Sequence, residues 1–283
     1  MLDFPRTTIE NVSVSRMLIG INWFLGYSHT SKAKDDFIIE HQTRQRLREI
    51  ITVFMKAGID TLYGVRPETT PGLMAAIADA EQATGRKCIT IATPTLNIAD
   101  GPEALAETGR LLDAHAKLGA TFCLPHQATT DALVDRRKRC ITNMDKYCAM
   151  IRARGMIPGL STHMPEAPVY ADESGLDVAT YIQIYNPVGF LMQIEVDWVH
   201  RMIWNCQKPV ICIKPMAAGR CLPLVGMAFA WSTLRDQDMV CVGTLTADEA
   251  RELIDLSWSI LERRSSTIAL QRTRSKESVE KKQ

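Results

Sequence analysis

The feature of this sequence that most constrains its fold is an alternation, repeated eight times, of short β-branched apolar runs with longer segments of helical period. A strand, a helix and a second strand form the unit from which parallel sheets are built. Eight such units over about 245 residues predict a single (β/α)8 barrel, the TIM barrel fold. The apolar runs are residues 17–22, 60–64, 87–93, 120–124, 156–161, 180–185, 209–214 and 240–243.

The segment after the first run shows the helical period clearly. Its apolar residues follow the spacing i, i+3, i+4, i+7, i+8, which places them on one face of a helix. Such a helix packs its apolar face against a sheet, as a barrel requires. The residues are Leu47, Ile50, Ile51, Phe54 and Met55.

Capping residues and glycines mark where the helices begin and end. We expect helix starts at residues 70–71, where Thr precedes Pro, and at 100–103 and 246–249, which have capping-box spacing. Glycine after a helix supplies the positive φ that the C′ position commonly needs. The expected C′ glycines are Gly58, Gly85, Gly119, Gly155 and Gly175.

A doubly wound open sheet is the alternative architecture. It usually carries a glycine-rich turn after its first strand, and residues 20–26 do not read Gly-x-Gly-x-x-Gly. With 46% hydrophobic and 23% charged residues among 283, the chain has enough apolar material for one large core. We therefore predict one barrel domain over residues 1–262 and a charged tail over 263–283.

The charge of the chain is distributed unevenly. The formal net charge is +1, but residues 263–283 hold seven basic and two acidic residues, which leaves −4 on the rest. A mildly acidic body argues against a nucleic-acid partner, because phosphate binding needs clustered cations on a folded face. No run approaches the roughly 20 apolar residues of a membrane helix, and the first ten residues lack the apolar centre of a signal peptide. We expect a cytoplasmic protein without a membrane partner.

Eight cysteines are present, and no two are spaced as Cys-x-x-Cys. Four of them lie in the apolar runs, where cysteine behaves as a small buried hydrophobic residue. We interpret all eight as reduced, in keeping with a cytosolic protein and without a disulfide or metal framework.

A barrel of this kind builds its active site from the carboxyl ends of the strands and the loops that follow them. Polar and aromatic side chains occur at each of these positions, so we expect them to converge on one pocket. They are Asn22, Trp23, Asp60, Tyr63, Thr93, His126, Gln127, Thr162, His163, Gln183, Tyr185, Asn186, Lys214, Gly243 and Thr244.

Three members of this set carry the most chemical information. His126 and His163 fall at the ends of consecutive strands, which suits an acid/base pair as well as a structural role. Lys214 ends the seventh strand, and a lysine buried there needs an anionic ligand or a carboxylate partner. The two histidines do not predict a metal site, because no carboxylate except that of Asp60, which begins its strand, accompanies them.

Six stretches around the strand ends are similar, in order and spacing, to those of the aldo-keto reductases. The similarity covers residues 12–261 and is greatest to the shorter bacterial members, whose strand-five motif also ends in Ser-Thr/Ser-His. The stretches are Val-Ser-Arg-Met-Leu-Ile-Gly (14–20), Gly-Ile-Asp-Thr-Leu-Tyr-Gly (58–64), Gly-Leu-Ser-Thr-His (159–163), Gln-Ile-Tyr-Asn-Pro (183–187), Lys-Pro-Met-Ala-Ala-Gly (214–219) and Val-Gly-Thr-Leu-Thr (242–246).

This resemblance implies a barrel that binds NADP(H) or NAD(H) and reduces a small carbonyl compound. It implies Asp60, Tyr63 and His126 as catalytic residues, with the Tyr63 phenol as general acid. A phenol has a reference pKa near 10, so it needs a cation or a strong hydrogen-bond donor beside it to act near pH 7. The residues implied for the cofactor are Thr162, His163, Gln183, Lys214, Arg220 and Thr244.

The sequence also departs from the family pattern. The third strand ends in Thr93-Pro94, where the family has its activating lysine, and Asp60 and Tyr63 are two residues closer together than usual. Two other functions therefore stay open. One is a non-redox lyase, aldolase or isomerase for a small oxygenated or phosphorylated acid, using His126, His163 and Lys214. The other is a catalytically silent ligand-binding barrel. A homo-oligomer built through helix faces is also open.

Overall fold

The computed structural model describes residues 3–66 and 70–269, together with residues 273, 276 and 279. Within these residues the main sheet is entirely parallel, with the strand order β10-β11-β12-β13-β3-β4-β5-β6-β9. This order confirms the predicted barrel, and each strand overlaps a predicted run. The strands are β3 (Met17–Gly20), β4 (Thr61–Val65), β5 (Ile89–Ala92), β6 (Phe122–Cys123), β9 (Ile157–Pro158), β10 (Leu160–Ser161), β11 (Tyr181–Ile184), β12 (Val210–Ile213) and β13 (Met239–Val242).

The barrel closes at Gly159. Strands β9 and β10 lie at opposite ends of the strand order, yet only this residue separates them in the chain. Its N–H donates to the carbonyl of Cys123 at 3.2 Å, and the next N–H, of Leu160, donates to the carbonyl of Thr180 at 3.1 Å. A Cβ on Gly159 would lie 2.7 Å from that Thr180 oxygen, so only glycine fits this seam.

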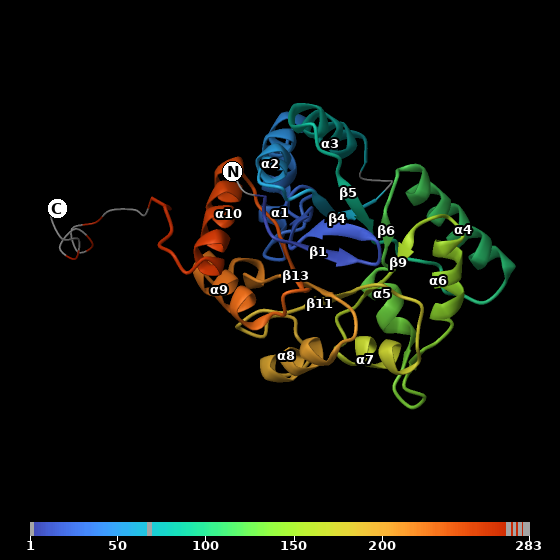
Figure 1. The fold of residues 1–283 in the computed structure, drawn as a ribbon. Helices are drawn as coiled ribbons and strands as arrows, with labels where there is room; N and C mark the ends of the chain where they lie inside the picture. The colour runs from blue at the N-terminus through green and yellow to red at the C-terminus, as the bar shows by residue number, and fades with distance from the viewer. Residues whose placement is uncertain (1–2, 67–69, 270–272, 274–275, 277–278, 280–283) are drawn as a thin grey trace.

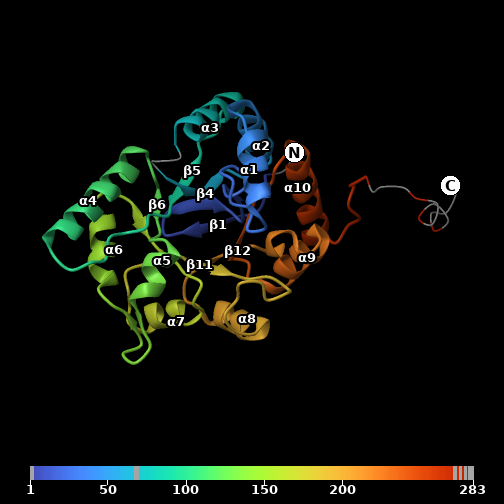
Figure 2. The same ribbon diagram turned by 180° about the vertical axis from the view of Figure 1, so that it is seen from behind.

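Helices surround the strands on all sides, as the two opposite views of the ribbon show (Figures 1 and 2). Two of them, α1 and α2, lie between β3 and β4, whereas one helix follows each of most other strands. The helices are α1 (Lys32–His41), α2 (Arg44–Lys56), α3 (Thr70–Thr84), α4 (Pro102–Lys117), α5 (Gln127–Thr130), α6 (Met144–Arg152), α7 (Glu166–Glu173), α8 (Val196–Asn205), α9 (Pro223–Thr233) and α10 (Ala247–Leu261).

Most predicted helix boundaries are confirmed. All five residues of the apolar stripe in α2 are buried, and all five predicted C′ glycines have positive φ. The Thr246 hydroxyl accepts from the N–H of Glu249, as a capping box requires. The capping box predicted at residues 100–103 is wrong: Gly101 is the N-cap of α4, with φ 111°, and makes no side-chain cap. The side chains of residues 70 and 71 lie outside the described part of the chain.

The strands separate two apolar layers. Alternate residues point inward and outward, so Ile182 and Ile184 of β11 belong to the cluster inside the barrel. Tyr181 and Tyr185 of the same strand belong to the larger cluster beneath the helices. This alternation decides which predicted site residues face the barrel interior.

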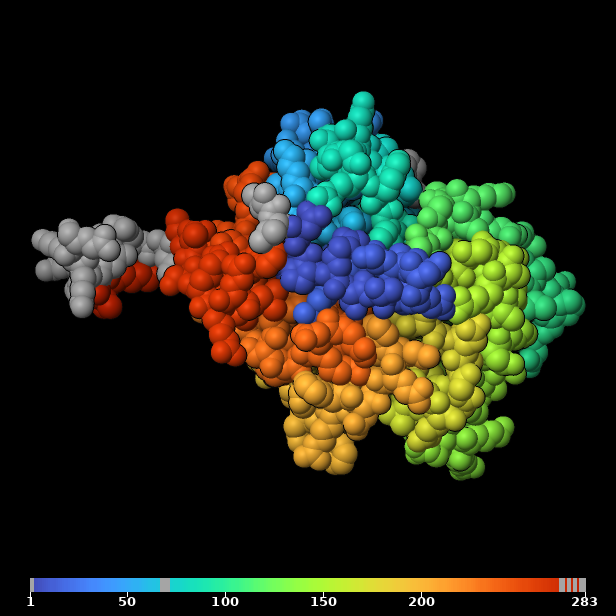
Figure 3. All heavy atoms as spheres, viewed as in Figure 1, coloured from blue at the N-terminus to red at the C-terminus, as the bar shows by residue number. Residues whose placement is uncertain are grey.

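A hairpin that the sequence analysis did not predict covers the amino end of the barrel. Strands β1 (Arg6–Ile9) and β2 (Val12–Ser15) pair antiparallel, and Ile9 and Val14 are buried with the interior cluster. In the space-filling view the hairpin lies across the molecule (Figure 3). Because this hairpin covers the amino end, the site must open at the carboxyl end.

A second small hairpin, β7 (Val134–Asp135) and β8 (Cys140–Ile141), follows α5 and the 3-10 helix η2 (Asp131–Leu133).

Part of the predicted tail is attached to the barrel. Arg264 forms an ion pair with Asp255 of α10, and the Ser266 hydroxyl and Thr267 N–H donate to the same carboxylate. The side chain of Ile268 packs against the outer apolar cluster. All eight cysteines are free thiols, as predicted, and none of the described helices is both long and apolar enough to cross a membrane.

Candidate functional site at the carboxyl end of the barrel

Tyr63, the candidate acid, lies on β4 and faces the barrel interior with the apolar cluster there. Burial, with a smaller contribution from the neighbouring Cys241, raises the pKa of its phenol to about 12. A side-chain hydrogen bond with Ser161 of β10 and the charge of Arg66 both lower this pKa. The phenol is therefore protonated at neutral pH and has a cation nearby.

Three histidines lie close enough to interact electrostatically around the same mouth. Burial, together with the nearby Lys214, His126 and His29, lowers the pKa of His163 to about 4. The pKa of His126 is lowered by burial, by Arg66 and by Lys214. Both imidazoles are neutral at pH 7, the state in which one nitrogen accepts a proton and the other donates one.

His126 has a defined local setting. It is the N-cap of α5, and its Nδ1 accepts the N–H of Ala128 at 3.3 Å. A neutral imidazole that accepts at Nδ1 carries its proton on Nε2. His126 therefore has an N–H free of this cap to offer to a ligand.

Lys214 ends β12 in a left-handed backbone conformation, with φ 59°. Burial lowers the pKa of its ammonium, which Cys241 of the next strand partly offsets. No carboxylate oxygen of the described residues is within ion-pair distance of it. Strained backbone and a desolvated cation are typical of functional sites.

Arg220 follows the 3-10 helix η3 (Ala217–Gly219) and links three loops at the mouth. Its guanidinium carbon lies 3.9 Å from the ring centroid of Phe190. It donates to the carbonyl of Ala217 at 3.2 Å and to that of His29 at 3.5 Å. Its charge is exposed, so it remains able to meet an anion.

The structure places Asp60 away from these residues. It precedes β4 at the amino end of the barrel, where its carboxylate accepts from Arg6 of the hairpin at 3.0 Å. Three residues of an extended strand span roughly 10 Å, so it cannot join Tyr63 on a ligand at the carboxyl end. The catalytic role expected for Asp60 does not fit this position.

Gln183 and Thr162 are also oriented differently from the expectation. Gln183 is fully buried between Tyr181 and Tyr185, on the face of β11 beneath the helices, and neither of its amide atoms has a hydrogen-bond partner among the described residues. The Thr162 hydroxyl donates to Asp131 at 2.5 Å and accepts from the N–H of Met164 at 3.0 Å. Thr244, which lies beyond the end of β13, has a buried hydroxyl to which no residue of the described ranges is hydrogen-bonded.

Trp23 and Phe24 do not occupy the same place. Trp23 packs against Gly243, where an added Cβ would lie 3.0 Å from the indole Cδ1. Phe24 belongs to the cluster beneath the helices. These contacts place the two aromatic residues along the β3 and β13 side of the barrel.

Sequence reasoning missed four residues of this site. Arg66 and Ser161 interact with Tyr63, Cys241 interacts with Tyr63 and Lys214, and His29 interacts with His163 and Lys214. Ser161 and Cys241 were predicted to lie in strands. The alternation of inward and outward residues in the structure then shows that both face the barrel interior. Nothing in the sequence distinguishes His29, because its approach depends on a long loop; its Nε2 lies 3.2 Å from the Asn22 amide nitrogen.

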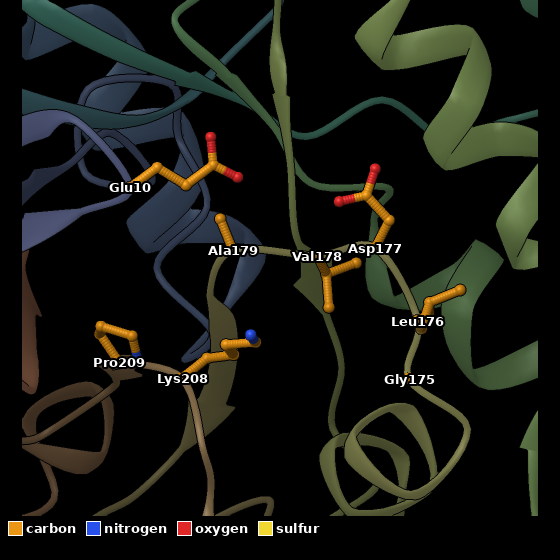
Figure 4. Close-up of a pocket in the computed structure, with 8 residues that line it drawn as sticks. All are labelled: Glu10, Gly175, Leu176, Asp177, Val178, Ala179, Lys208 and Pro209. Carbon is orange, nitrogen blue, oxygen red and sulfur yellow. The ribbon is translucent and has the colours of Figure 1, made fainter.

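A cavity of about 510 Å³ lies at the other end of the barrel. It is formed by the β1–β2 turn and by the segments that precede β11 and β12 (Figure 4). Its wall includes Glu10 and Asp177, both paired with Arg152, and Lys208. It shares no residue with the carboxyl-end site.

The carboxyl-end arrangement combines a proton donor, two neutral imidazoles and desolvated positive charge. Tyr63 can protonate an oxygen, His126 can donate a hydrogen bond to it, and Lys214 can bind an anionic group or, once deprotonated, attack a carbonyl carbon. The pKa of Lys214 is lowered in the direction that the last reaction requires. Among the described residues no group of three or more metal-ligating side chains is present.

No family model matches the sequence, and no curated protein matches it significantly. The fold does match solved structures. An aldo-keto reductase from Bacillus halodurans, in its holo form, superposes with a TM-score of 0.57 at 13% identity, covering 96% of this chain and 99% of the other. An aldo/keto reductase from Brucella melitensis gives 0.54 at 12% identity, covering 92% and 93%.

Another similar structure is a truncated 3-deoxy-D-arabino-heptulosonate 7-phosphate synthase from Thermotoga maritima, with a TM-score of 0.53 at 11% identity. It covers 92% of this chain and 93% of the other. Identities this low establish architecture without establishing activity. The chain has the (β/α)8 barrel fold of the aldo-keto reductases, which other barrel enzymes share.

Proposed function

We propose that this protein is an NAD(P)-dependent reductase of small carbonyl compounds. The observation that carries the proposal is the position of Tyr63, a protonated phenol on the interior face of β4 in an aldo-keto-reductase-like barrel, where the charge of Arg66 acts on it and also on His126. In this role the Tyr63 hydroxyl gives its proton to the carbonyl oxygen. His126 Nε2 donates a hydrogen bond that orients that oxygen.

Arg66 takes the place of the absent lysine in this proposal. Thr93 is the residue that follows β5, so the cation near the phenol is instead the residue that follows β4. A positive charge favours the phenolate, and it lowers the pKa of Tyr63 against the effect of burial. A weaker acid results than in a site with a directly bonded ammonium.

The residues at the mouth fit a nucleotide cofactor in part. A bound NAD(P)H would supply the hydride. Lys214 and Arg220 offer positive charge for its phosphates, and the unpartnered Thr244 hydroxyl offers a buried hydrogen-bonding group. His163 faces the mouth near Lys214, whereas Gln183 and Thr162 do not fit the set.

Titration with NADPH and NADH, followed by fluorescence, tests the cofactor assignment. Binding with a Kd below roughly 1 mM is expected, since enzymes commonly work in this range. Lys214→Met should weaken it at least about tenfold, and Lys208→Met, at the amino-end cavity, should not. An absence of binding by either nucleotide would contradict the proposal.

Turnover with a panel of small aldehydes and ketones tests the acid. Tyr63→Phe should lower kcat by about 100-fold or more, because general acid catalysis contributes 10²–10⁴, and should leave nucleotide binding unchanged. The matched control is Tyr185→Phe. That buried phenol donates to Thr233 beneath the helices, so its loss affects stability and not turnover.

A second function is favoured by one observation, the desolvated Lys214 without a carboxylate partner. A lysine with a lowered pKa can form an imine with a carbonyl substrate, losing water, as in aldolases. Borohydride trapping of candidate oxo acids tests this, with Lys214→Met as the variant and Lys208→Met as the control. Trapping that persists in Lys214→Met would exclude this lysine.

A further inference from the structure

One side chain outside the predicted site connects its two histidines. Asp131 begins η2, directly after the four-residue helix α5 that His126 caps. Its carboxylate reaches from this element to the end of β10. Oδ1 accepts the Thr162 hydroxyl at 2.5 Å, and Oδ2 accepts the N–H of His163 at 3.2 Å.

The contacts fix the turn that carries His163. The Thr162 hydroxyl has one proton, which it gives to Asp131, and its oxygen accepts the N–H of Met164 at 3.0 Å. One carboxylate thus holds three consecutive residues at the strand end, two directly and one through the hydroxyl. Charge-assisted hydrogen bonds of this kind are the strong ones.

The segment that carries Asp131 is itself anchored at its other end. The backbone N–H of His126 donates to the carbonyl of Pro94 at 2.8 Å, and its side-chain Nδ1 caps α5. The Thr130 hydroxyl donates to the carbonyl of Pro125 at 3.1 Å. Residues 126–131 therefore connect the end of β6 to the end of β10 through hydrogen bonds at both of their ends.

Asp131 does this at an energetic cost. Burial raises the pKa of its carboxyl and Glu166 also raises it, whereas hydrogen bonds to Thr162, His163 and Met164 lower it. Without this carboxylate the Thr162 hydroxyl and the His163 N–H would lose their acceptor, so the desolvated carboxylate is retained for the hydrogen bonds that it makes to this turn.

We propose that Asp131 is a positioning residue that sets the distance and orientation between the His126 and His163 imidazoles, so that both act on one bound molecule. That the two histidines act in catalysis rests on the proposed function. That Asp131 holds the turn of His163 rests on the hydrogen bonds alone. The His163 imidazole is desolvated and lies within electrostatic range of Lys214, His126 and His29, and the position of its turn depends on the hydrogen bonds to Asp131.

The test is an NMR titration of the His163 side chain in the full chain, together with the pH profile of turnover. In the wild type we expect a low titration midpoint, because burial lowers the pKa of His163 to about 4. In Asp131→Ala its pKa should rise by about one unit or more toward the reference value of 6.5, as the imidazole reaches water. kcat should fall by about 10- to 100-fold with less than about a threefold change in KM.

Matched variants separate positioning from a general loss of structure. Asp135→Asn, on the adjacent hairpin, removes a carboxylate that caps only its own turn, and should change neither readout. If Asp131→Ala does not fold, Thr162→Val tests the same link, because it removes the hydroxyl alone. Thr162→Ser restores the hydroxyl and should return the His163 titration to its wild-type position.

The outcomes are distinct. A His163 titration that stays at its wild-type position in Asp131→Ala, or in Thr162→Val, overturns the positioning role. If the wild type binds no nucleotide and reduces no carbonyl, the proposed function fails, while the titration still decides the role of Asp131.

Discussion

The two ends of this barrel treat charge in opposite ways. At the amino end three partly buried arginines have carboxylate partners: Arg6 pairs with Asp60, Arg152 with Glu10 and Asp177, and Arg235 with Asp238. At the carboxyl end Lys214 has none among the described residues, and three histidines there have lowered pKa values. The ion pairs at the amino end stabilise the fold, whereas the unpaired charge of Lys214 is available to bind an anionic ligand. The difference matches the general division of barrels into a stabilising and a catalytic face.

Breaking the amino-end network should have the largest effect on stability. The Asp238 side chain is fully buried and binds Arg235 and the N–H of Val210. Asp238→Ala leaves the guanidinium without its partner, so we expect a loss of about 3 kcal/mol in the free energy of unfolding. Urea unfolding measures it. Nucleotide binding by the folded fraction should not change; a variant that binds poorly while folded would weaken the contrast between the two ends.

Removing the positive charge at the carboxyl end should reduce activity strongly and stability little. Lys214→Met removes a desolvated cation, so the free energy of unfolding should change by less than about 1 kcal/mol. Activity should fall by about 100-fold, equivalent to about 2.7 kcal/mol of transition-state binding. Comparing the urea midpoint with kcat/KM checks both. A large loss of stability would mean that Lys214 serves the fold instead.

The carboxyl-end histidines also predict a pH dependence. His29, His126 and His163 have pKa values lowered chiefly by burial, so the unfolded chain binds protons that the folded chain does not. Their stabilising effect is complete above the unfolded pKa of about 6.5 and is lost as pH falls toward 4. We expect about 1 kcal/mol less stability near pH 5 than near pH 7, reduced from an ideal value by solvent exposure. His163→Gln should flatten this slope, as measured by urea unfolding.

The smallest effect is expected at an exposed ion pair of the amino end. Arg86 binds Asp3 at 2.6 Å, and both side chains are partly exposed to solvent. Arg86→Ala should cost no more than about 1 kcal/mol, and added salt should reduce that cost. Thermal unfolding at low and high ionic strength measures it. If Arg86→Ala lost as much stability as Asp238→Ala, solvent exposure would not determine how much each ion pair contributes.

The sequence predicts the barrel well because its eight strand regions and most of its helices follow from local patterns. The strands are apolar runs, the stripe of α2 has helical period, and the C′ glycines take the positive φ expected of them. The β1–β2 hairpin was missed because its strands are four residues long and its turn lacks an Asn-Gly pair; Glu10, with φ 53°, occupies the left-handed position.

The site is less predictable, because sequence position along a strand does not tell which face a side chain takes. Residues 181–185 are apolar on both faces, as parallel strands usually are, so nothing local indicates that Gln183 points toward the helices. Asp60 is near Tyr63 in the chain but at the other end of the barrel. Asp131 becomes visible only when α5 brings it to β10.

The seam at Gly159 has a consequence for synthesis on the ribosome. Strands β3 to β9 belong to the first 158 residues, and the strands that join β9 back to β3 belong to the residues after it. Until that second half emerges, β3 and β9 are open edges with unpaired backbone groups, the kind of edge that recruits other chains. The nascent chain is therefore most exposed to aggregation while the residues after Gly159 are still being made, and strand β13, the last of the sheet to be made, removes the open edge at β3.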